Sequence, residues 1–267
     1  MSDDFVTDGE SGLALPGRFV ASKERYLFPP RAELCVPWEG VAPYRNAGYC
    51  GQYKFNDSRC LAWLRDGSWD VELWNRHNAR LKYSVPEFMG AGLQYLASSL
   101  GFEPGKWCAF DGGLLHFKHK LVKDVLVVWD ILAADGKSLF GTCYGDRYMK
   151  LFNFVENLGG VGVYFNSRGI SYESERGVLV GIELVAGVGK PGVFLPVNVN
   201  FVDFDSAWEN VNNLNGAVKR DNPDVSDPFL EGLVFKSLGW ELEPMGSVKN
   251  NGEFMARSRV VTGRHQF

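Results

Sequence analysis

The chain has 267 residues, of which 45% are hydrophobic and 14% aromatic, and this content excludes an intrinsically disordered chain. Its formal net charge is −4 and its pI is about 5.7. Dedicated nucleic-acid binders are usually basic, so the charge argues against tight nonspecific binding of nucleic acid. Any nucleic-acid contact would therefore come from a local basic face.

The five cysteines are scattered and show no CxxC spacing, so the sequence suggests neither a zinc site nor a disulfide framework. Free thiols are typical of a reducing compartment, so we expect a cytoplasmic protein. The N-terminus is acidic and lacks an apolar h-region, which argues against a signal peptide. No run of about 18 apolar residues occurs, so we expect no membrane partner.

The predicted elements mix short strands with a few helices. Residues 1–35 include a mixed, Gly- and Pro-rich stretch and form an expected N-terminal arm. Strands are predicted over residues 48–55, 60–65, 69–74, 107–117, 122–132, 178–185, 193–202, 233–238 and 254–261. Helices are predicted over residues 86–101, 146–158 and 206–214.

Local signals support these assignments. Met89, Leu93 and Leu96 recur at spacings of three and four residues, which indicates a helix with one apolar face. Gly101 is suited to end that helix. The Asp66-Gly67 pair between two β-prone runs is a hairpin signal. Antiparallel strands with helices at their sides indicate an α+β fold.

The stretch around Lys54 contains a candidate catalytic residue. Lys54 is expected at a strand end, before a polar turn, and Arg59 follows five residues later. A lysine can act as a covalent nucleophile once its amine is deprotonated. The alternative is a surface lysine and arginine that flank an Asn-Asp hairpin turn.

Further polar stretches follow at the ends of predicted strands. Glu231 begins a strand and could hold Mg²⁺ against a triphosphate, because this ion binds one or two carboxylates together with phosphate oxygens. Arg257 and Arg259 share one face of a strand, since side chains alternate. Trp129 offers a flat ring on which a base could stack. Each also has a structural interpretation: a solvated strand face for the arginines and a core position for Trp129.

Together the stretches resemble, in chain order, the motifs of the covalent nucleotidyltransferases, the superfamily of ATP-dependent DNA ligases, RNA ligases and mRNA capping enzymes. The match to motif IV, Glu-Gly-(Leu/Ile/Val)-Val-x-Lys, is without departure over residues 231–236. Motif I, Lys-x-Asp-Gly-x-Arg, has Asn56 and Asp57 in place of Asp and Gly. Motif III, Asp-Gly-Glu, has Gly113 in place of Glu. The resemblance runs from about Gln52 to residue 259.

The resemblance implies a role for each matching residue. Lys54 would attack the α-phosphate of ATP and form a lysyl-AMP intermediate, and Glu231 would bind Mg²⁺ or Mn²⁺. Further catalytic residues would be Lys236, Arg257 and Arg259. Nucleotide-binding residues would be Gln52, Arg59, Arg76, Asp111 and Trp129. Arg147, at a predicted helix start, is interpreted as fold-supporting.

The resemblance also implies the fold and the reaction. Residues 36–267 would form an ATP-grasp-like nucleotidyltransferase (adenylation) domain of two antiparallel sheets flanked by helices, with ATP in the groove between them. Only eight residues follow Arg259 in the 267-residue chain, so we expect no OB-fold domain.

These expectations favour a small, phage-like polynucleotide ligase that acts as a monomer in the cytoplasm of a bacterial host. It would join a nucleic-acid 5′-phosphate to a 3′-OH, with RNA slightly favoured over DNA. The alternatives are a catalytically degenerate module that binds nucleotide or nucleic acid, an mRNA capping guanylyltransferase, and a structural protein with chance matches.

Overall fold

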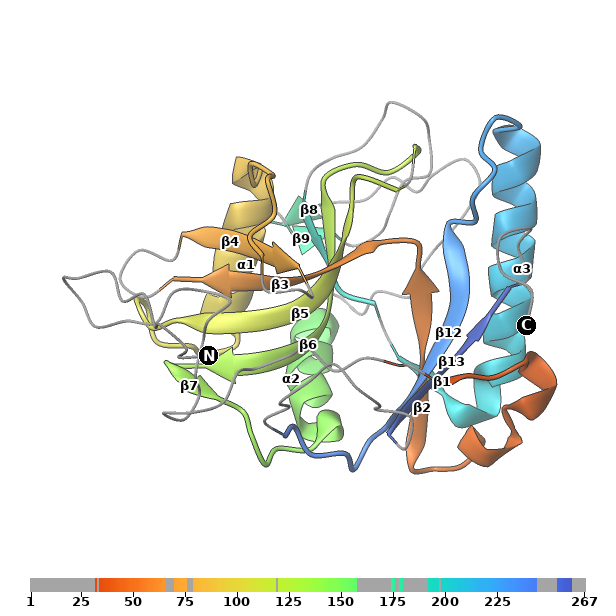
Figure 1. The fold of residues 1–267 in the computed structure, drawn as a ribbon. Helices are drawn as coiled ribbons and strands as arrows, with labels where there is room; N and C mark the ends of the chain where they lie inside the picture. The colour runs from red at the N-terminus through yellow and green to blue at the C-terminus, as the bar shows by residue number, and fades with distance from the viewer. Residues whose placement is uncertain are drawn as a thin grey trace, which may run out of the picture.

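The computed structural model describes residues 32, 34–65, 70–75, 79–118, 120–157, 174–175, 178–179, 192–196, 198–243 and 254–260. Within these residues the chain forms two β-sheets and three α-helices (Figure 1). The predicted α+β class is therefore confirmed in its coarse form. Among the described helices, none combines the length and the apolar character needed to cross a bilayer.

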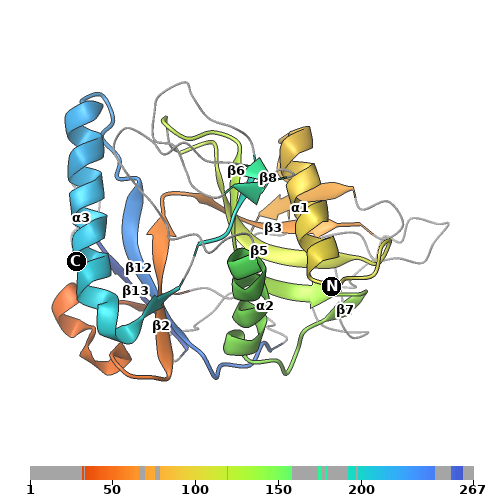
Figure 2. The same cartoon turned by 180° about the vertical axis from the view of Figure 1, so that it is seen from behind.

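The smaller sheet has the strand order β1-β13-β12-β2-β11. Its strands are β1 (Leu34–Cys35), β2 (Tyr49–Phe55), β11 (Val199–Asn200), β12 (Leu230–Ser237) and β13 (Met255–Arg259). The helix α3 (Phe204–Asp221) lies along this sheet, as Figures 1 and 2 both show. Its buried residues, which include Phe204 and Val211, join one core cluster with Phe235 of β12.

The larger sheet has the strand order β4-β3-β5-β6-β10-β9-β8, with β7 paired to β6. Its strands are β3 (Ser58–Leu64), β4 (Val71–Asn75), β5 (Cys108–Leu115), β6 (Val125–Ala134), β7 (Lys137–Ser138), β8 (Ser174–Glu175), β9 (Val178–Leu179) and β10 (Gly192–Phe194). The helices α1 (Glu87–Ser99) and α2 (Tyr144–Asn157) cover one face of this sheet (Figure 2). A second core cluster fills the space between these two helices and the sheet.

The prediction of purely antiparallel sheets is wrong for three strand pairs. β1 runs parallel to β13, and β10 runs parallel to both β6 and β9. A parallel pair needs a long crossover connection, usually a helix. The chain between β6 and β10 contains α2 and supplies such a crossover, which makes a parallel neighbour of β6 possible.

The predicted strand over residues 193–202 is also wrong. Residues 192–194 form β10 in the larger sheet, and residues 199–200 form β11 in the smaller one. We call residues 195–196 and 198 between them the crossing segment. Pro196 lies there and cannot donate a backbone hydrogen bond to a sheet, which breaks the run. Residues 201–203 form a 3₁₀ turn that leads into α3.

Most other predicted elements lie within a few residues of the observed ones, whereas the strand predicted over residues 178–185 is described only at Val178–Leu179 (β9), and its remainder lies outside the described residues. α1 begins at Glu87, and Gly101 just after it has a φ of +76°, as a helix-ending glycine should. The α3 helix is longer than predicted, since it runs to Asp221. The Asp66-Gly67 turn lies outside the described residues, as do residues 1–31, although β3 and β4 do pair antiparallel. The boundary after residue 35 stays a prediction.

Candidate functional site

Lys54 and Arg59 lie where the chain passes from one sheet to the other. Lys54 is in β2, which pairs with β12 in the smaller sheet, whereas Arg59 is in β3, which pairs with β4 and β5 in the larger sheet. Asn56 marks the passage, and its N–H donates to the carbonyl of Phe229 at 3.0 Å. The alternative of a simple hairpin turn is therefore wrong, and the two cations come from different sheets.

One face of the smaller sheet collects five of the predicted site residues. Residues that pair across strands share a face, and so do residues two apart along a strand. The register places three rows across β2, β12 and β13, namely Lys54–Gly232–Arg259, Gln52–Val234–Arg257 and Cys50–Lys236–Met255. Lys54, Gln52, Lys236, Arg257 and Arg259 therefore point to the same side.

Glu231 reaches this face because of a β-bulge. Phe55 pairs with Leu230 and Lys54 pairs with Gly232, so Glu231 is the extra residue on β12. A bulge changes the direction of a side chain, and bulges are frequent beside active sites. Gly232 has a φ of +142°, and a Cβ there would lie 2.0 Å from the carbonyl oxygen of Ser258. Only glycine fits, which gives the Glu-Gly pair a physical reason.

The bulge brings Glu231 into contact with two cations, and we call Lys54, Glu231 and Arg259 the Lys54 cluster. Lys54 Nζ donates to Glu231 Oε2 at 2.5 Å, and Arg259 Nη2 lies 2.9 Å from the same oxygen. Burial raises the pKa of Glu231, but the charges of Lys54 and Arg259 bring that pKa below its usual value. The Lys54 and Glu231 side chains keep 22% and 14% exposure, so solvent or a ligand can reach them.

A second network lies on the larger sheet. Arg59 donates to both carboxylate oxygens of Asp111, with Nε at 2.6 Å from Oδ1. Trp129 Nε1 donates to Asp111 Oδ2 at 3.0 Å, and the Arg59 guanidinium lies 5.2 Å from the centre of the Trp129 ring. Asp111 is 1% exposed. Its predicted contact with a nucleotide would therefore require one of these hydrogen bonds to open.

Trp129 is placed by a second bulge. Asp111 pairs with Asp130 and Gly112 pairs with Val128, so Trp129 is the extra residue on β6. It is 9% exposed and belongs to the core cluster under α3. Lys236 Nζ from the smaller sheet lies 5.9 Å from the Trp129 ring centre. Trp129 thus packs in the core and also borders the polar site, so the core interpretation and the base-stacking prediction both remain.

Lys236 is a buried cation with aromatic neighbours. It is 3% exposed, and its Nζ lies 4.6 Å from the Tyr144 ring centre and donates to the Tyr144 hydroxyl at 3.4 Å. Burial lowers the pKa of Lys236 to about 8, although Asp130 and Asp111 act in the opposite direction. The ammonium at residue 236 is therefore easier to deprotonate than an ordinary lysine.

This shift predicts a pH dependence of stability. Above about pH 8 the folded chain releases the Lys236 proton, whereas the unfolded chain keeps it up to about pH 10.4. The unfolded state then binds more protons, so the free energy of unfolding contributed by Lys236 rises with pH in that window. Between pH 7 and 10 the wild type should gain about 1–3 kcal/mol relative to Lys236→Met. Urea unfolding at several pH values measures this gain, and parallel pH curves for the two proteins would contradict it.

Two of the departures from the motif pattern, Asp57 and Gly113, meet in space. A Cβ on Gly113 would lie 2.3 Å from Cγ of Asp57, so the carboxylate of Asp57 occupies the space above that glycine. Burial raises the pKa of Asp57 to about 6, against the effect of Lys54 and Lys118. The sequence comparison noted Asp57 and Gly113 as separate departures. The structure places the carboxylate of Asp57 in the space that a side chain at residue 113 would occupy.

We therefore predict a coupled effect of substitutions at these positions. Gly113→Ala should destabilise the fold by about 1–3 kcal/mol through overpacking, and Asp57→Gly in the same chain should restore most of this loss, because it removes the clashing group. Gly112→Ala is the matched control, since its Cβ would lie 2.3 Å from the backbone oxygen of Val127 and Asp57→Gly cannot relieve that contact. Thermal unfolding of the single and double variants gives the coupling, and additive effects at residues 57 and 113 would argue against the contact.

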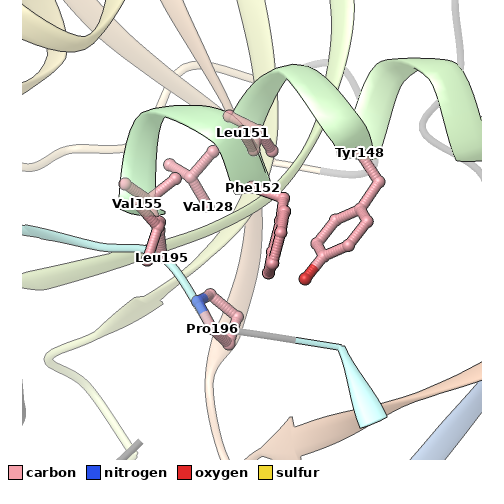
Figure 3. Close-up of a pocket in the computed structure, with 7 residues that line it drawn as sticks. All are labelled: Val128, Tyr148, Leu151, Phe152, Val155, Leu195 and Pro196. Atoms are coloured by element: carbon pink, nitrogen blue, oxygen red, sulfur yellow. The ribbon is translucent and has the colours of Figure 1, made fainter. Parts of the chain in front are cut away.

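Gln52, which lies on the site face of β2, is hydrogen-bonded to the crossing segment. Gln52 is 3% exposed, and its Nε2 donates to Oδ1 of Asn198 at 2.9 Å. The backbone N–H of Asn198 donates to the Tyr148 hydroxyl at 2.7 Å. Figure 3 shows the apolar cleft that Tyr148 and Phe152 of α2 form with Pro196. None of the predicted site residues lines this cleft.

The remaining residues have mixed outcomes. Arg147 is 1% exposed and binds Asp130 through Nε and Nη2 at 2.9 and 3.0 Å, which agrees with a fold-supporting role. The Nε of Arg257 is buried and has no hydrogen-bond partner within the described residues, so it is available to an anion. Arg76 lies outside the described residues. Sequence reasoning did not assign roles to Asn198 and Tyr144, because neither belongs to a recognised motif.

The carboxylates fit a divalent ion that arrives with a phosphate ligand. Within the described residues, no group of three or more His, Cys, Asp or Glu side chains is arranged as a complete metal site. Mg²⁺ commonly takes only one or two carboxylates and completes its shell with phosphate oxygens and water. Glu231, with Asp57 close enough for the charge of Glu231 to raise its pKa, is consistent with such partial coordination.

Comparisons with known proteins give only distant likenesses. No family model matches the sequence, and no curated protein matches it. The chain is similar to a mycobacterial DNA ligase D complexed with ATP and MES, with 15% identity, a TM-score of 0.45, and coverage of 87% of this chain and 60% of that chain. It is also similar to a Lig E DNA ligase, with 10% identity, a TM-score of 0.43, and coverage of 88% and 70%.

A third similar structure is a Chlorella virus DNA ligase–adenylate, with 9% identity, a TM-score of 0.34, and coverage of 81% of this chain and 64% of that chain. The chain spans about 60% of the length of the mycobacterial ligase. All three are named as DNA ligases.

Proposed function

We propose that this chain is an ATP-dependent polynucleotide ligase of the covalent nucleotidyltransferase superfamily. The observation that carries the proposal is the Lys54 cluster, in which Lys54, Glu231 and Arg259 meet on one face of three adjacent strands. A potential nucleophile, a carboxylate and a fixed cation are the groups that transfer of a nucleotidyl group requires. Lys54 and Glu231 lie 177 positions apart in the sequence, so the tertiary fold brings them together.

In the first step Lys54 leaves its ion pair, loses a proton and attacks the α-phosphorus of ATP. A phosphorus–nitrogen bond forms, the bond to the bridging oxygen breaks, and pyrophosphate leaves. Arg259 and Arg257 stabilise the negative charge on the transferred phosphate, and positioning with electrostatics supplies most of the catalysis. Mg²⁺ or Mn²⁺ at Glu231, when bound, would neutralise charge on the phosphates.

In the later steps AMP passes from Lys54 to a nucleic-acid 5′-phosphate, and a 3′-OH then displaces AMP to join the strands. Trp129 and Gln52 would contact the base, and Arg59 and Arg76 would contact phosphates. Asp57 takes the place of the absent motif III carboxylate as an acceptor for a nucleotide hydroxyl. Asp111 supports this arrangement by holding Arg59 and Trp129.

Intact-mass measurement after incubation with ATP and Mg²⁺, with GTP in parallel, tests this function. We expect a gain of one AMP with ATP and no gain with GTP. A gain of GMP instead would indicate a capping guanylyltransferase. No gain with either nucleotide would favour a catalytically degenerate binding module, for which the departures at Asn56, Asp57 and Gly113 are the specific observation.

The adenylylated chain then serves to identify the substrate. Nicked RNA and nicked DNA with a 5′-phosphate are compared as acceptors, and RNA is slightly favoured in our proposal. Faster sealing of nicked DNA would reverse that preference while leaving the ligase assignment intact. Light scattering of the purified chain would test the proposed monomer.

A further inference from the structure

The loop between β5 and β6 is a basic surface that the nucleotide chemistry does not use. We call residues 116–118 and 120–124 the basic loop. Figure 1 shows that it rises beyond the strands of the larger sheet. Lys118, Lys120 and Lys123 are exposed there, and Phe117 is 53% exposed. The whole chain carries a net charge of −4, so three exposed lysines within six positions form a local exception.

The basic loop is held in a defined shape. Asp124 has a φ of +60°, and its Oδ1 accepts a hydrogen bond from the Tyr83 hydroxyl at 2.7 Å and lies 2.6 Å from Nδ1 of His116. Lys123 donates to the backbone oxygen of His116. Leu121 and Val122 are buried, so they fix the base of the loop in the core. The exposed lysines and Phe117 are therefore presented by an anchored segment.

Phe117 is supported on its edge and open to solvent elsewhere. Its ring lies 4.7 Å from the His116 ring and 6.1 Å from the Tyr83 ring, both in edge-on arrangements. A single exposed apolar side chain is common on protein surfaces, so Phe117 is informative only together with the lysines that flank it. An aromatic ring flanked by lysines is the combination that binds single-stranded nucleic acid, through base stacking and phosphate attraction.

The basic loop is also hydrogen-bonded to the segment that follows Lys54. Lys118 Nζ donates to the backbone oxygen of Asp57, three residues after Lys54. The charge of Lys118 opposes the rise that burial causes in the pKa of Asp57 and helps to lower the pKa of Glu231, so this cation lies within electrostatic range of the Lys54 cluster. A nucleic-acid strand bound to the basic loop would therefore have its phosphates close to the amine of Lys54.

We propose that the basic loop binds the nucleic-acid strand that the site acts on, with the lysines on phosphates and Phe117 against a base or sugar. This inference rests on the proposed function for its substrate. Lys120 supplies a mobile phosphate contact, while Lys118 and Lys123 also maintain the loop through their backbone hydrogen bonds. Phe117 supplies the contact that does not depend on salt.

The test uses the full chain and labelled 5′-phosphorylated strands, as single-stranded RNA, single-stranded DNA and nicked duplex. Fluorescence anisotropy is measured over a salt series for the wild type, Phe117→Ala and Lys120→Ala. Lys137→Ala is the matched control, because Lys137 is an exposed lysine beyond the other end of the ten-residue strand β6. At about 3.3 Å per residue, that end lies on the order of 30 Å from the basic loop.

We expect Phe117→Ala to weaken binding about 5-fold or more at every salt concentration. Lys120→Ala should reduce the slope of log affinity against log salt by about 0.7–0.9, and Lys137→Ala should change neither quantity. Wild-type binding by both loop variants would overturn the inference. Competition by polyglutamate as strong as that by an unlabelled strand would also overturn it, because it would assign the loop to an acidic protein.

The nucleotide chemistry is tested separately, by measuring AMP incorporation in the absence of nucleic acid. If the wild type takes up AMP but both loop variants bind strands normally, this inference fails and the proposed function stands. If the wild type takes up no AMP, the proposed function fails and the anisotropy series still decides whether the basic loop binds strands.

Discussion

Lys54→Ala is expected to abolish the gain of one AMP on incubation with ATP and Mg²⁺. Among the described residues, Lys54 is the lysine whose Nζ contacts Glu231, the carboxylate that Arg259 also contacts. The loss should be complete, because a covalent intermediate cannot form without its nucleophile. Intact mass spectrometry measures the result directly, and label on the variant equal to that on the wild type would refute the assignment of Lys54.

The controls for this experiment separate chemistry from folding. In Lys54→Ala, Glu231 keeps Arg259 as a partner at 2.9 Å, so the carboxylate is not left without a cation. We therefore expect the variant to unfold near the wild-type temperature. Lys54→Arg keeps the positive charge but not a nucleophilic amine, so it should remain inactive and folded. Lys137→Ala, in β7 beyond the end of β6, should retain full AMP incorporation.

Glu231→Ala is expected to reduce AMP incorporation by about 100-fold or more, as loss of one electrostatic group in an active site commonly does. The substitution removes the acceptor that Lys54 and Arg259 share, and the two cations then repel each other. It also removes the carboxylate proposed to hold Mg²⁺. Single-turnover AMP incorporation measured over a Mg²⁺ and Mn²⁺ series gives the size of the defect.

A conservative variant distinguishes the charge of Glu231 from its hydrogen bonds. Glu231→Gln keeps an acceptor for Lys54 and Arg259 but loses the negative charge, so we expect it to be nearly as defective as Glu231→Ala. Glu209→Ala, an exposed carboxylate on α3, serves as the matched control. Activity of Glu231→Gln close to wild type would show that the charge and the metal are dispensable at this position.

The residue types of the site could be predicted from the sequence alone. The motif order grouped Lys54, Glu231, Lys236 and Arg259, and their roles in catalysis stay predictions. Strand alternation predicted that Arg257 and Arg259 share a face, and helix periodicity predicted α1 nearly to its ends. The predictions of the shared face and of α1 succeed because each depends on spacing within a single element, and the period of a strand or helix is a local property of the backbone.

The arrangement of the site was decided only by the tertiary structure. Glu231 and Trp129 reach it through β-bulges, and a bulge exists only relative to the partner strand against which one residue is extra. The passage between sheets at Asn56 and the meeting of Asp57 with Gly113 likewise depend on strands far apart in the chain. Register across strands is set by packing of the whole core, so spacing along one strand could supply the chemistry of the site but not its geometry.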